Sequence, residues 1–307
     1  MWKSTCCPFA ALPNFTSQSL KMKKQQFLIF LLVAAFSFLS CNNKEDTYTL
    51  KMRLAPGDKF KQSMDTDMEV AVNAMGQDVS TKMKMLCELS FEVTGDTGNL
   101  KKLSFTYDDF KMRMKMANVP EEVNMDSIMD KSTEGIKGQT ITIMLNEKNE
   151  IVEVNGIENI IATSDMQARA QMEKMFSKDQ LNSMMGMMFQ MYPNKPVKVG
   201  ETWENEIETS VADIKMKVKG KYTLKSVKDG VASVEMKGTY TGKGTLSQGG
   251  TSIDVDMDGN QEGIINIGLA DGYLKDADYK MDVKAEMNTM GQKMPMTMKG
   301  RYLMKGK

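Results

Sequence analysis

The sequence predicts a mainly β protein of the α+β class, built on a curved antiparallel sheet or half-barrel with a short helical insertion. Apolar and polar residues alternate over long stretches, turn-forming Asp-Gly and Gly-Gln pairs separate these stretches, and helical spacing is confined to the middle of the chain. The turns at 73–77 and 288–292 share four of five residues, so the strands around them fit either one sheet or two related lobes.

The clearest strand is expected at 79–93, where mostly apolar residues on odd positions alternate with mostly polar residues on even ones. Later strands change from odd to even positions after Asp108-Asp109 and again after Ala212-Asp213. One extra residue restores the buried face, so a β-bulge is expected at the first place and a bulge or a turn at the second. Asp229-Gly230 and Asp271-Gly272 predict hairpins.

The middle of the chain, 157–192, is predicted to be helical. A capping box opens at Ser177 and apolar residues follow it at helical spacing, after a shorter helix that is expected at 164–176. The insertion separates an N-terminal β lobe, 47–156, from a C-terminal β lobe, 193–307, which is expected to pack with the first.

The first forty residues, 1–40, are interpreted as a secretory leader that is removed. Three lysines at 21–24 precede an apolar run at 27–39, and a small residue stands directly before Cys41. An apolar run of about thirteen residues is too short to cross a bilayer, which takes about twenty. Because the residues before Met22 carry no leader features, Met22 is an alternative start.

Cys41 is the expected site of lipid attachment. The tetrapeptide Phe-Leu-Ser-Cys that ends there resembles a bacterial lipobox, in which the cysteine thiol is acylated and becomes the new N-terminus. Ordinary signal cleavage beside an incidental cysteine is the alternative. The polar tether at 41–46 resembles the surface-export signal of Bacteroidota lipoproteins through three residues, Lys44, Glu45 and Asp46. The expected location is therefore the outer membrane, on the cell surface or on the periplasmic face.

Composition argues against several classes of function. The chain has no histidine, which removes Ser-His-Asp and Cys-His catalysis and every His-ligated metal site. Beyond the leader only Cys41 and Cys87 remain, and no intramolecular disulfide is expected because Cys41 is assigned to lipid. The leader holds four of the 40 basic residues and none of the 40 acidic ones, so the rest is mildly acidic and nucleic acid is not an expected partner. Neither a catalytic residue nor a cofactor is expected.

Methionine is unusually frequent, at 32 residues. One interpretation is a Cu(I) site, because soft thioethers select Cu(I). Another is core packing, in which methionine is an adaptable filler. A third reading is a flexible apolar groove that holds an acyl chain, a lipid or a partner peptide. The candidate groove residues are Met83, Met85, Met112, Met114, Met294, Met296 and Met298.

A weak calcium candidate begins at Asp254. Asp254, Asp256 and Asp258 precede Gly259 with the spacing of a calcium loop, and Glu262 adds a carboxylate. Apolar residues alternate with these aspartates, so a polar strand face is the competing interpretation, and no metal is assigned.

The octamer from Pro196 to Trp203 resembles a signature of uncharacterised Bacteroidota outer-membrane lipoproteins, a domain of unknown function in which Pro, Val, Gly, an acidic residue and Trp recur between two β-rich parts. The resemblance would cover most of 47–306. It implies the β-rich layout and an envelope location, and it implies no activity. Trp203 is expected to plug the core.

The expected function is that of a membrane-anchored lipoprotein which binds an apolar ligand or a protein partner without catalysis. A structural or adhesive role at the cell surface is the alternative. The carboxylates at 108–109 and 204–208 are interpreted as solvated strand faces rather than as acid–base groups.

Overall fold

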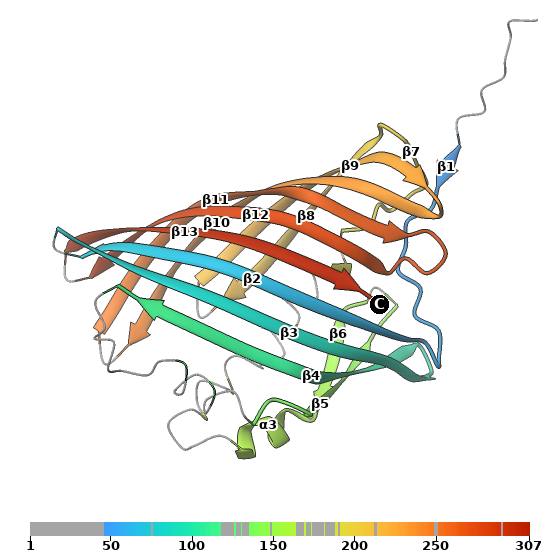
Figure 1. The fold of residues 1–307 in the computed structure, drawn as a ribbon, viewed down its shortest axis with the longest axis horizontal. Coiled ribbons are helices and arrows are strands. Elements are labelled where there is room, and N and C mark those ends of the chain that lie inside the picture. The colour runs from blue at the N-terminus through green and yellow to red at the C-terminus, as the bar shows by residue number, and fades with distance from the viewer. Residues whose placement is uncertain are drawn as a thin grey trace, which may run out of the picture. The chain divides into compact units, whose positions relative to one another are not determined.

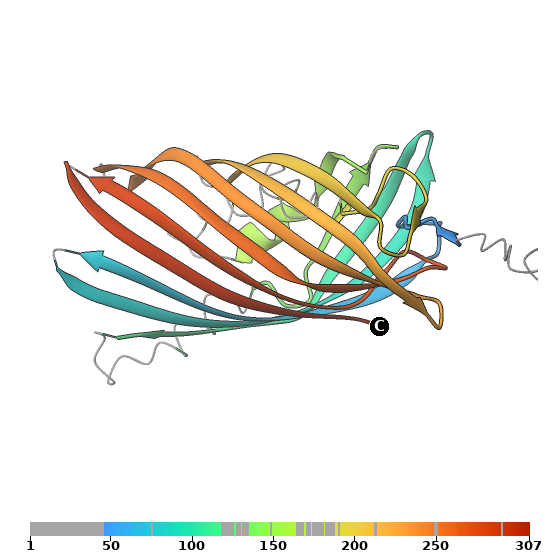
Figure 2. The ribbon, with the colours of Figure 1, turned by 90° about the horizontal axis from the view of Figure 1, so that it is seen from above.

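The computed structural model describes residues 46–74, 76–117, 126, 130, 135–147, 149–163, 169, 173, 181, 188–189, 191–211, 214–248, 251–289 and 291–307. Within them lies one antiparallel sheet of eleven strands, in the order β6-β5-β4-β3-β2-β13-β12-β11-β10-β9-β8, and a separate pair of strands, β1 and β7 (Figures 1 and 2). The predicted mainly β, antiparallel fold is confirmed.

The elements follow one another along the chain as β1 (Thr47–Tyr48), β2 (Lys59–Ala74), β3 (Gln77–Thr97), β4 (Leu100–Met116), β5 (Thr140–Leu145), β6 (Ile151–Asn155), α3 (Ile157–Thr163), β7 (Val197–Lys198), β8 (Thr202–Val211), β9 (Ile214–Lys228), β10 (Val231–Gln248), β11 (Thr251–Gly268), β12 (Leu274–Thr289) and β13 (Gln292–Gly306). Most strands pair with their sequence neighbours, as hairpins require. The long-range link is the pairing of β2 with β13, which joins the stretches 47–156 and 193–307 in a single sheet. The edge strands β6 and β8 are not paired with each other in this sheet, so it does not close.

The strand pairing shows where the predicted bulge and hairpin turns lie. Glu88 pairs with Asp109 and Leu89 with Tyr107, so Asp108 is the extra residue of the predicted β-bulge. At the second change of position, Val211 at the end of β8 pairs with Ile214 at the start of β9, and residues 212–213 lie outside the described residues. Asp229 and Gly230 both have positive φ, as a two-residue hairpin loop demands.

Part of the predicted helical insertion is described. Its first seven residues form α3, and the backbone is also helical at Arg169, Glu173, Leu181 and 188–189. The remainder of the predicted helices, including the capping box at 177–180, lies outside the described residues. Among the described helices none combines the length and the apolar character that crossing a membrane requires.

The main core lies on one face of the sheet. Buried side chains of this core come from β4, such as Phe105, and from β8, such as Trp203, although seven strands separate β4 from β8 in the sheet. Side chains so far apart in strand order can share one core only if the sheet curls, and the curvature is visible in Figures 1 and 2. The apolar face is therefore concave.

Candidate functional site

A cavity of about 310 Å³ opens on the concave face of the sheet. Its lining comes from nine strands and from the segment before β7, and it contains no Asp, Glu, Lys or Arg among the described residues. The lining residues are Gln62, Met64, Cys87, Leu89, Phe91, Phe105, Met188, Met191, Asn205, Ile207, Val218, Gly220, Tyr222, Met236, Gln261, Ile265, Leu274, Ala277, Tyr279, Tyr302 and Met304. Ligand sites in proteins are typically about 300–1,000 Å³ and mostly apolar, so this cavity has the size and the character of a small one.

The cavity exists because strand pairing places its lining on one face. Met64 lies opposite Cys87 on one side and opposite Met304 on the other, and Met304 lies opposite Ala277. Residues that face each other across antiparallel strands point to the same side of the sheet. The period-2 pattern of each strand therefore converges on a single apolar surface.

A short segment, which we call the strap, covers this surface. It consists of Met188, Phe189, Met191 and Tyr192, and Met188 and Met191 line the cavity. Three hydrogen bonds fasten it across the concave face. The indole Nε1 of Trp203 donates to the carbonyl oxygen of Met191 at 2.9 Å, and Nδ2 of Asn205 donates to that of Tyr192 at 3.3 Å. The hydroxyl of Tyr192 donates to the carbonyl oxygen of Gly272 at 2.5 Å, so the strap is held at both β8 and the β11–β12 turn.

The turn from Pro196 to Trp203 positions the indole. Gly200 adopts a φ of +88°, which favours glycine, and its N–H donates to the carbonyl oxygen of Leu224 at 2.7 Å. Glu201 accepts hydrogen bonds from the Lys195 ammonium and from the backbone N–H of Lys198, and both hold the pKa of this carboxyl below its usual range. Trp203 is 8% exposed, which confirms the expected core plug.

One end of the cavity is polar but uncharged. Four tyrosines gather there, with Gln261 among them, and we call them the tyrosine cluster: Tyr222, Tyr240, Tyr279 and Tyr302. The hydroxyl of Tyr240 donates to Oε1 of Gln261, and the rings of Tyr279 and Tyr302 stack with centroids 4.7 Å apart. Burial is the main cause that raises the pKa of every hydroxyl in this cluster, so all four stay protonated at neutral pH.

Two glycines make room for the tyrosine cluster. A Cβ on Gly220 would lie 2.6 Å from the hydroxyl of Tyr222, and a Cβ on Gly238 would lie 2.7 Å from Nε2 of Gln261. Both glycines face the concave side, where the bare backbone lets a large side chain from the same or the next strand lie across it.

Cys87 also lines the cavity, and its thiol has a raised pKa. Its side chain is 4% exposed, and burial, together with the nearby carboxylates of Asp109 and Glu88, raises the pKa of the thiol to about 12. The thiolate is the reactive form, so Cys87 behaves as a small apolar group.

The predicted groove methionines share one face but do not line this cavity. Met83 lies opposite Met114, Met85 opposite Met112, and all four are half-buried on the concave side. The other three, Met294, Met296 and Met298, lie on the same face of β13.

The cavity and the predicted groove involve different methionines. Five methionines line the cavity: Met64, Met188, Met191, Met236 and Met304. The Met-x-Met runs on which the prediction was based lie in the other half of the strands, away from the cavity. Strand periodicity assigns a face, but it does not reveal the position along the strand at which the curl and the strap enclose space.

The calcium candidates lie in a strand. Asp254, Asp256 and Asp258 are all part of β11, where the backbone is extended rather than looped, and Asp256 forms an ion pair of 2.7 Å with Lys243. Glu262 lies further along the same strand. This placement agrees with the interpretation as a polar strand face, and the described residues hold no group of three His, Cys, Asp or Glu residues suited to a metal ion.

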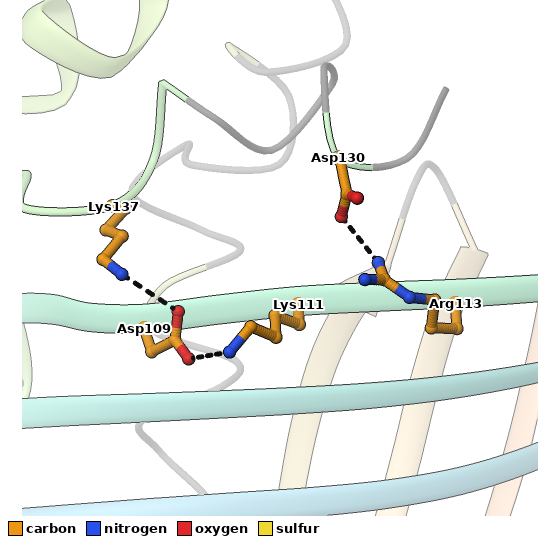
Figure 3. Close-up of polar contacts among 5 residues, drawn as sticks. All are labelled: Asp109, Lys111, Arg113, Asp130 and Lys137. Carbon is orange, nitrogen blue, oxygen red and sulfur yellow. Dashed lines mark hydrogen bonds and ion pairs between the residues drawn. The ribbon is translucent and has the colours of Figure 1, made fainter. Parts of the chain in front are cut away.

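The carboxylates at the bulge of β4 form surface ion pairs (Figure 3). Asp109 contacts Lys111 at 2.6 Å and Lys137 at 3.5 Å, and Arg113 contacts Asp130 at 2.6 Å. The hydrogen bond from Lys111 is the main cause that lowers the pKa of Asp109. A carboxyl held in its ionised form on the outer face matches the prediction of a solvated surface cluster.

The expected lipidation and export residues are placed as follows. Cys41, Lys44 and Glu45 lie outside the described residues, and Asp46 is exposed at the start of the described chain. The anchor and the export signal stay predictions.

Three solved structures align with this chain at low sequence identity and low TM-score. Lipovitellin, in a structure concerned with lipid–protein interactions, has 9% identity and a TM-score of 0.44 over 83% of this chain and 25% of that chain. An outer-membrane channel from Pseudomonas putida F1 has 9% identity and a TM-score of 0.24 over 83% of this chain and 97% of that one. The autotransporter NalP translocator domain from Neisseria meningitidis has 6% identity and a TM-score of 0.19 over 92% and 95%. This chain thus spans about a quarter of the lipovitellin chain.

No curated protein matches the sequence. A family of unknown function, DUF6263, matches residues 98–274, more than half of the 307 residues. The matched stretch contains the strap, the turn from Pro196 to Trp203, and strands β8 to β11, which supply much of the cavity lining. The chain therefore belongs to the family of unknown function DUF6263.

Proposed function

We propose that this protein binds an apolar ligand in the cavity between sheet and strap, without catalysis, at the cell envelope. The observation that carries the proposal is the cavity itself: about 310 Å³ of space with an apolar, uncharged lining. Well-packed interiors contain few voids larger than a water molecule, so we expect a ligand to fill a cavity of this size.

The chemistry of the lining supports binding over catalysis. The ionisable groups among the described lining residues are the thiol of Cys87 and three tyrosine hydroxyls, all of them with raised pKa values. General acid–base catalysis works best with a group whose pKa lies near the operating pH. Groups that stay protonated at neutral pH can donate hydrogen bonds to a ligand.

A cavity-filling substitution tests the proposal. Met304→Trp places a larger side chain into the lining, whereas Met296→Trp makes the same change eight residues away, on the same face of β13 but outside the cavity. With the neutral fluorescent probe N-phenyl-1-naphthylamine, we expect Met304→Trp to weaken binding at least tenfold and Met296→Trp to change it little. Equal affinities for both variants and the unaltered protein would rule out the cavity as the binding site.

The location is a separate part of the proposal and rests on the leader and Cys41. Replacing the thiol removes the only expected point of acylation, and stable anchoring needs more than one acyl chain. Cys41→Ser is expected to move the protein from the membrane fraction to the soluble fraction of lysed cells. A variant that sediments with membranes as the unaltered protein does would contradict lipid anchoring, and it would leave the cavity proposal standing.

A further inference from the structure

We infer that the ligand is an uncharged amphiphile, a hydrocarbon chain with a hydroxyl or carbonyl oxygen at one end, and that the tyrosine cluster receives this oxygen. The inference rests on the proposed function and deepens it. It follows from the unequal chemistry of the two ends of the cavity, which is mostly apolar around the strap, apart from Gln62 and Asn205, and polar around Gln261.

The apolar end fits a chain. Met64, Met188 and Met191 meet there with leucine and phenylalanine side chains, and flexible thioethers adapt to a chain that has no fixed shape. A water molecule occupies ~30 Å³ in the liquid. If a methylene group takes the same volume, the cavity has room for roughly ten methylene groups.

The polar end offers hydrogen bonds. Tyr222, Tyr279 and Tyr302 line the cavity, and their hydroxyls have no hydrogen-bond partner among the described residues. Gln261 is 8% exposed, and its Oε1 is already used by Tyr240. These hydroxyls are therefore free to donate hydrogen bonds to a ligand oxygen.

A second observation marks the same place. Thr66 lies directly opposite Tyr302 in the β2–β13 pairing and is 2% exposed. Its hydroxyl has no hydrogen-bond partner among the described residues. A buried hydroxyl without a partner is costly, so the surroundings of Tyr302 are short of a polar atom that the described chain does not supply.

The absence of charge in the lining decides the class of head group. Among the described lining residues there is neither lysine nor arginine, so a carboxylate or phosphate would lose its hydration without gaining a cation from them. Tyrosine hydroxyls and amides suffice for an uncharged oxygen. An alcohol, ester or ketone is therefore expected to bind better than the anion of the corresponding acid.

Competition against N-phenyl-1-naphthylamine with decane, 1-decanol and decanoate at pH 8 tests the inference, because the three compounds share the chain length and differ in the head. We expect 1-decanol to bind at least threefold more tightly than decane and at least tenfold more tightly than decanoate. Tyr302→Phe should weaken 1-decanol binding roughly 3- to 10-fold, the equivalent of one hydrogen bond, and leave decane binding unchanged. Tyr279→Phe serves as a second variant, and Tyr48→Phe, outside the cavity, is the control.

The outcomes separate the inference from the proposed function. If decane and 1-decanol bind equally, or if neither cavity variant affects 1-decanol, the polar end has no role and the inference is overturned while an apolar site remains. If decanoate binds most tightly, the ligand is an anion and the inference is again overturned. If neither the probe nor any of the three compounds binds, the proposed function fails as well.

Discussion

Replacing Tyr192 of the strap by phenylalanine removes a single hydroxyl, and we expect this substitution, Tyr192→Phe, to have a measurable effect. The side chain of Tyr192 is 9% exposed, and its hydroxyl donates to the carbonyl oxygen of Gly272 at 2.5 Å, across 80 residues of sequence. Phenylalanine keeps the ring and its packing, so the substitution isolates the bond that joins the strap to the β11–β12 turn.

The magnitude follows from the burial of both partners. Gly272 is buried in a tight turn, where even a Cβ would lie 2.0 Å from the carbonyl oxygen of Lys51, so water has little room to replace the lost donor. A buried acceptor left without its partner costs about 1–3 kcal/mol. For a chain of this size each kcal/mol lowers Tm by about 2–4 °C.

Calorimetry and urea unfolding measure the loss directly, and the slope of the urea transition should stay the same because the exposed surface does not change. Tyr48→Phe is the matched control, since the hydroxyl of Tyr48 has no hydrogen-bond partner in the described part of the chain. We also expect N-phenyl-1-naphthylamine to dissociate faster from Tyr192→Phe, because a loosened strap opens the cavity. An unchanged Tm together with an unchanged dissociation rate would refute the role of the strap as a fastened cover.

Three further predictions concern the sheet, the surface and the thiol. Gly263→Ala should destabilise the protein by at least ~3 kcal/mol in urea unfolding, because its Cβ would lie 2.2 Å from a backbone oxygen of β12. Gly300→Ala, which meets only a movable tyrosine ring at 3.0 Å, should cost much less, and equal losses would argue against the backbone clash. The hydrogen bond from Ser90 lowers the pKa of Asp108, so this carboxyl stabilises the fold above its unfolded pKa of about 3.9, and the contribution is lost as pH falls through the lower folded pKa. Asp108→Asn should therefore lose less Tm than the unaltered protein between about pH 6 and pH 2, and parallel curves would exclude this linkage. Because burial raises the pKa of the Cys87 thiol to about 12, peptide mapping should find Cys87 alkylated at neutral pH only after denaturant is added; labelling of the native protein would show that the thiol is accessible.

Most of the secondary structure could be predicted from local sequence patterns. The strand at 79–93 lies within β3, and the hairpins at 229–230 and 271–272 connect the expected strands. The bulge at Asp108 followed from a one-residue change of the apolar face, since only an inserted residue restores the side chains to the core. These features depend on neighbours within a few residues, so they can be read without the rest of the fold.

The site was predicted only in its general character. An apolar, methionine-lined surface was expected from the alternation, and the concave face has that composition. The candidate residues, such as Met83 and Met296, lie on the correct face but outside the cavity. The tyrosine cluster was not predicted, because nothing in the spacing of Tyr279 and Tyr302 distinguishes a hydroxyl that faces a cavity from one that faces solvent.

The sequence by itself determined which residues form strands, which face of each strand is apolar, and where the hairpins turn. These properties depend on side-chain period and on local backbone preferences. Only the tertiary structure decided that β2 pairs with β13, that the sheet curls, and that the strap crosses its concave face. Each of these joins residues far apart in the chain, and the cavity with its polar end exists only where they meet.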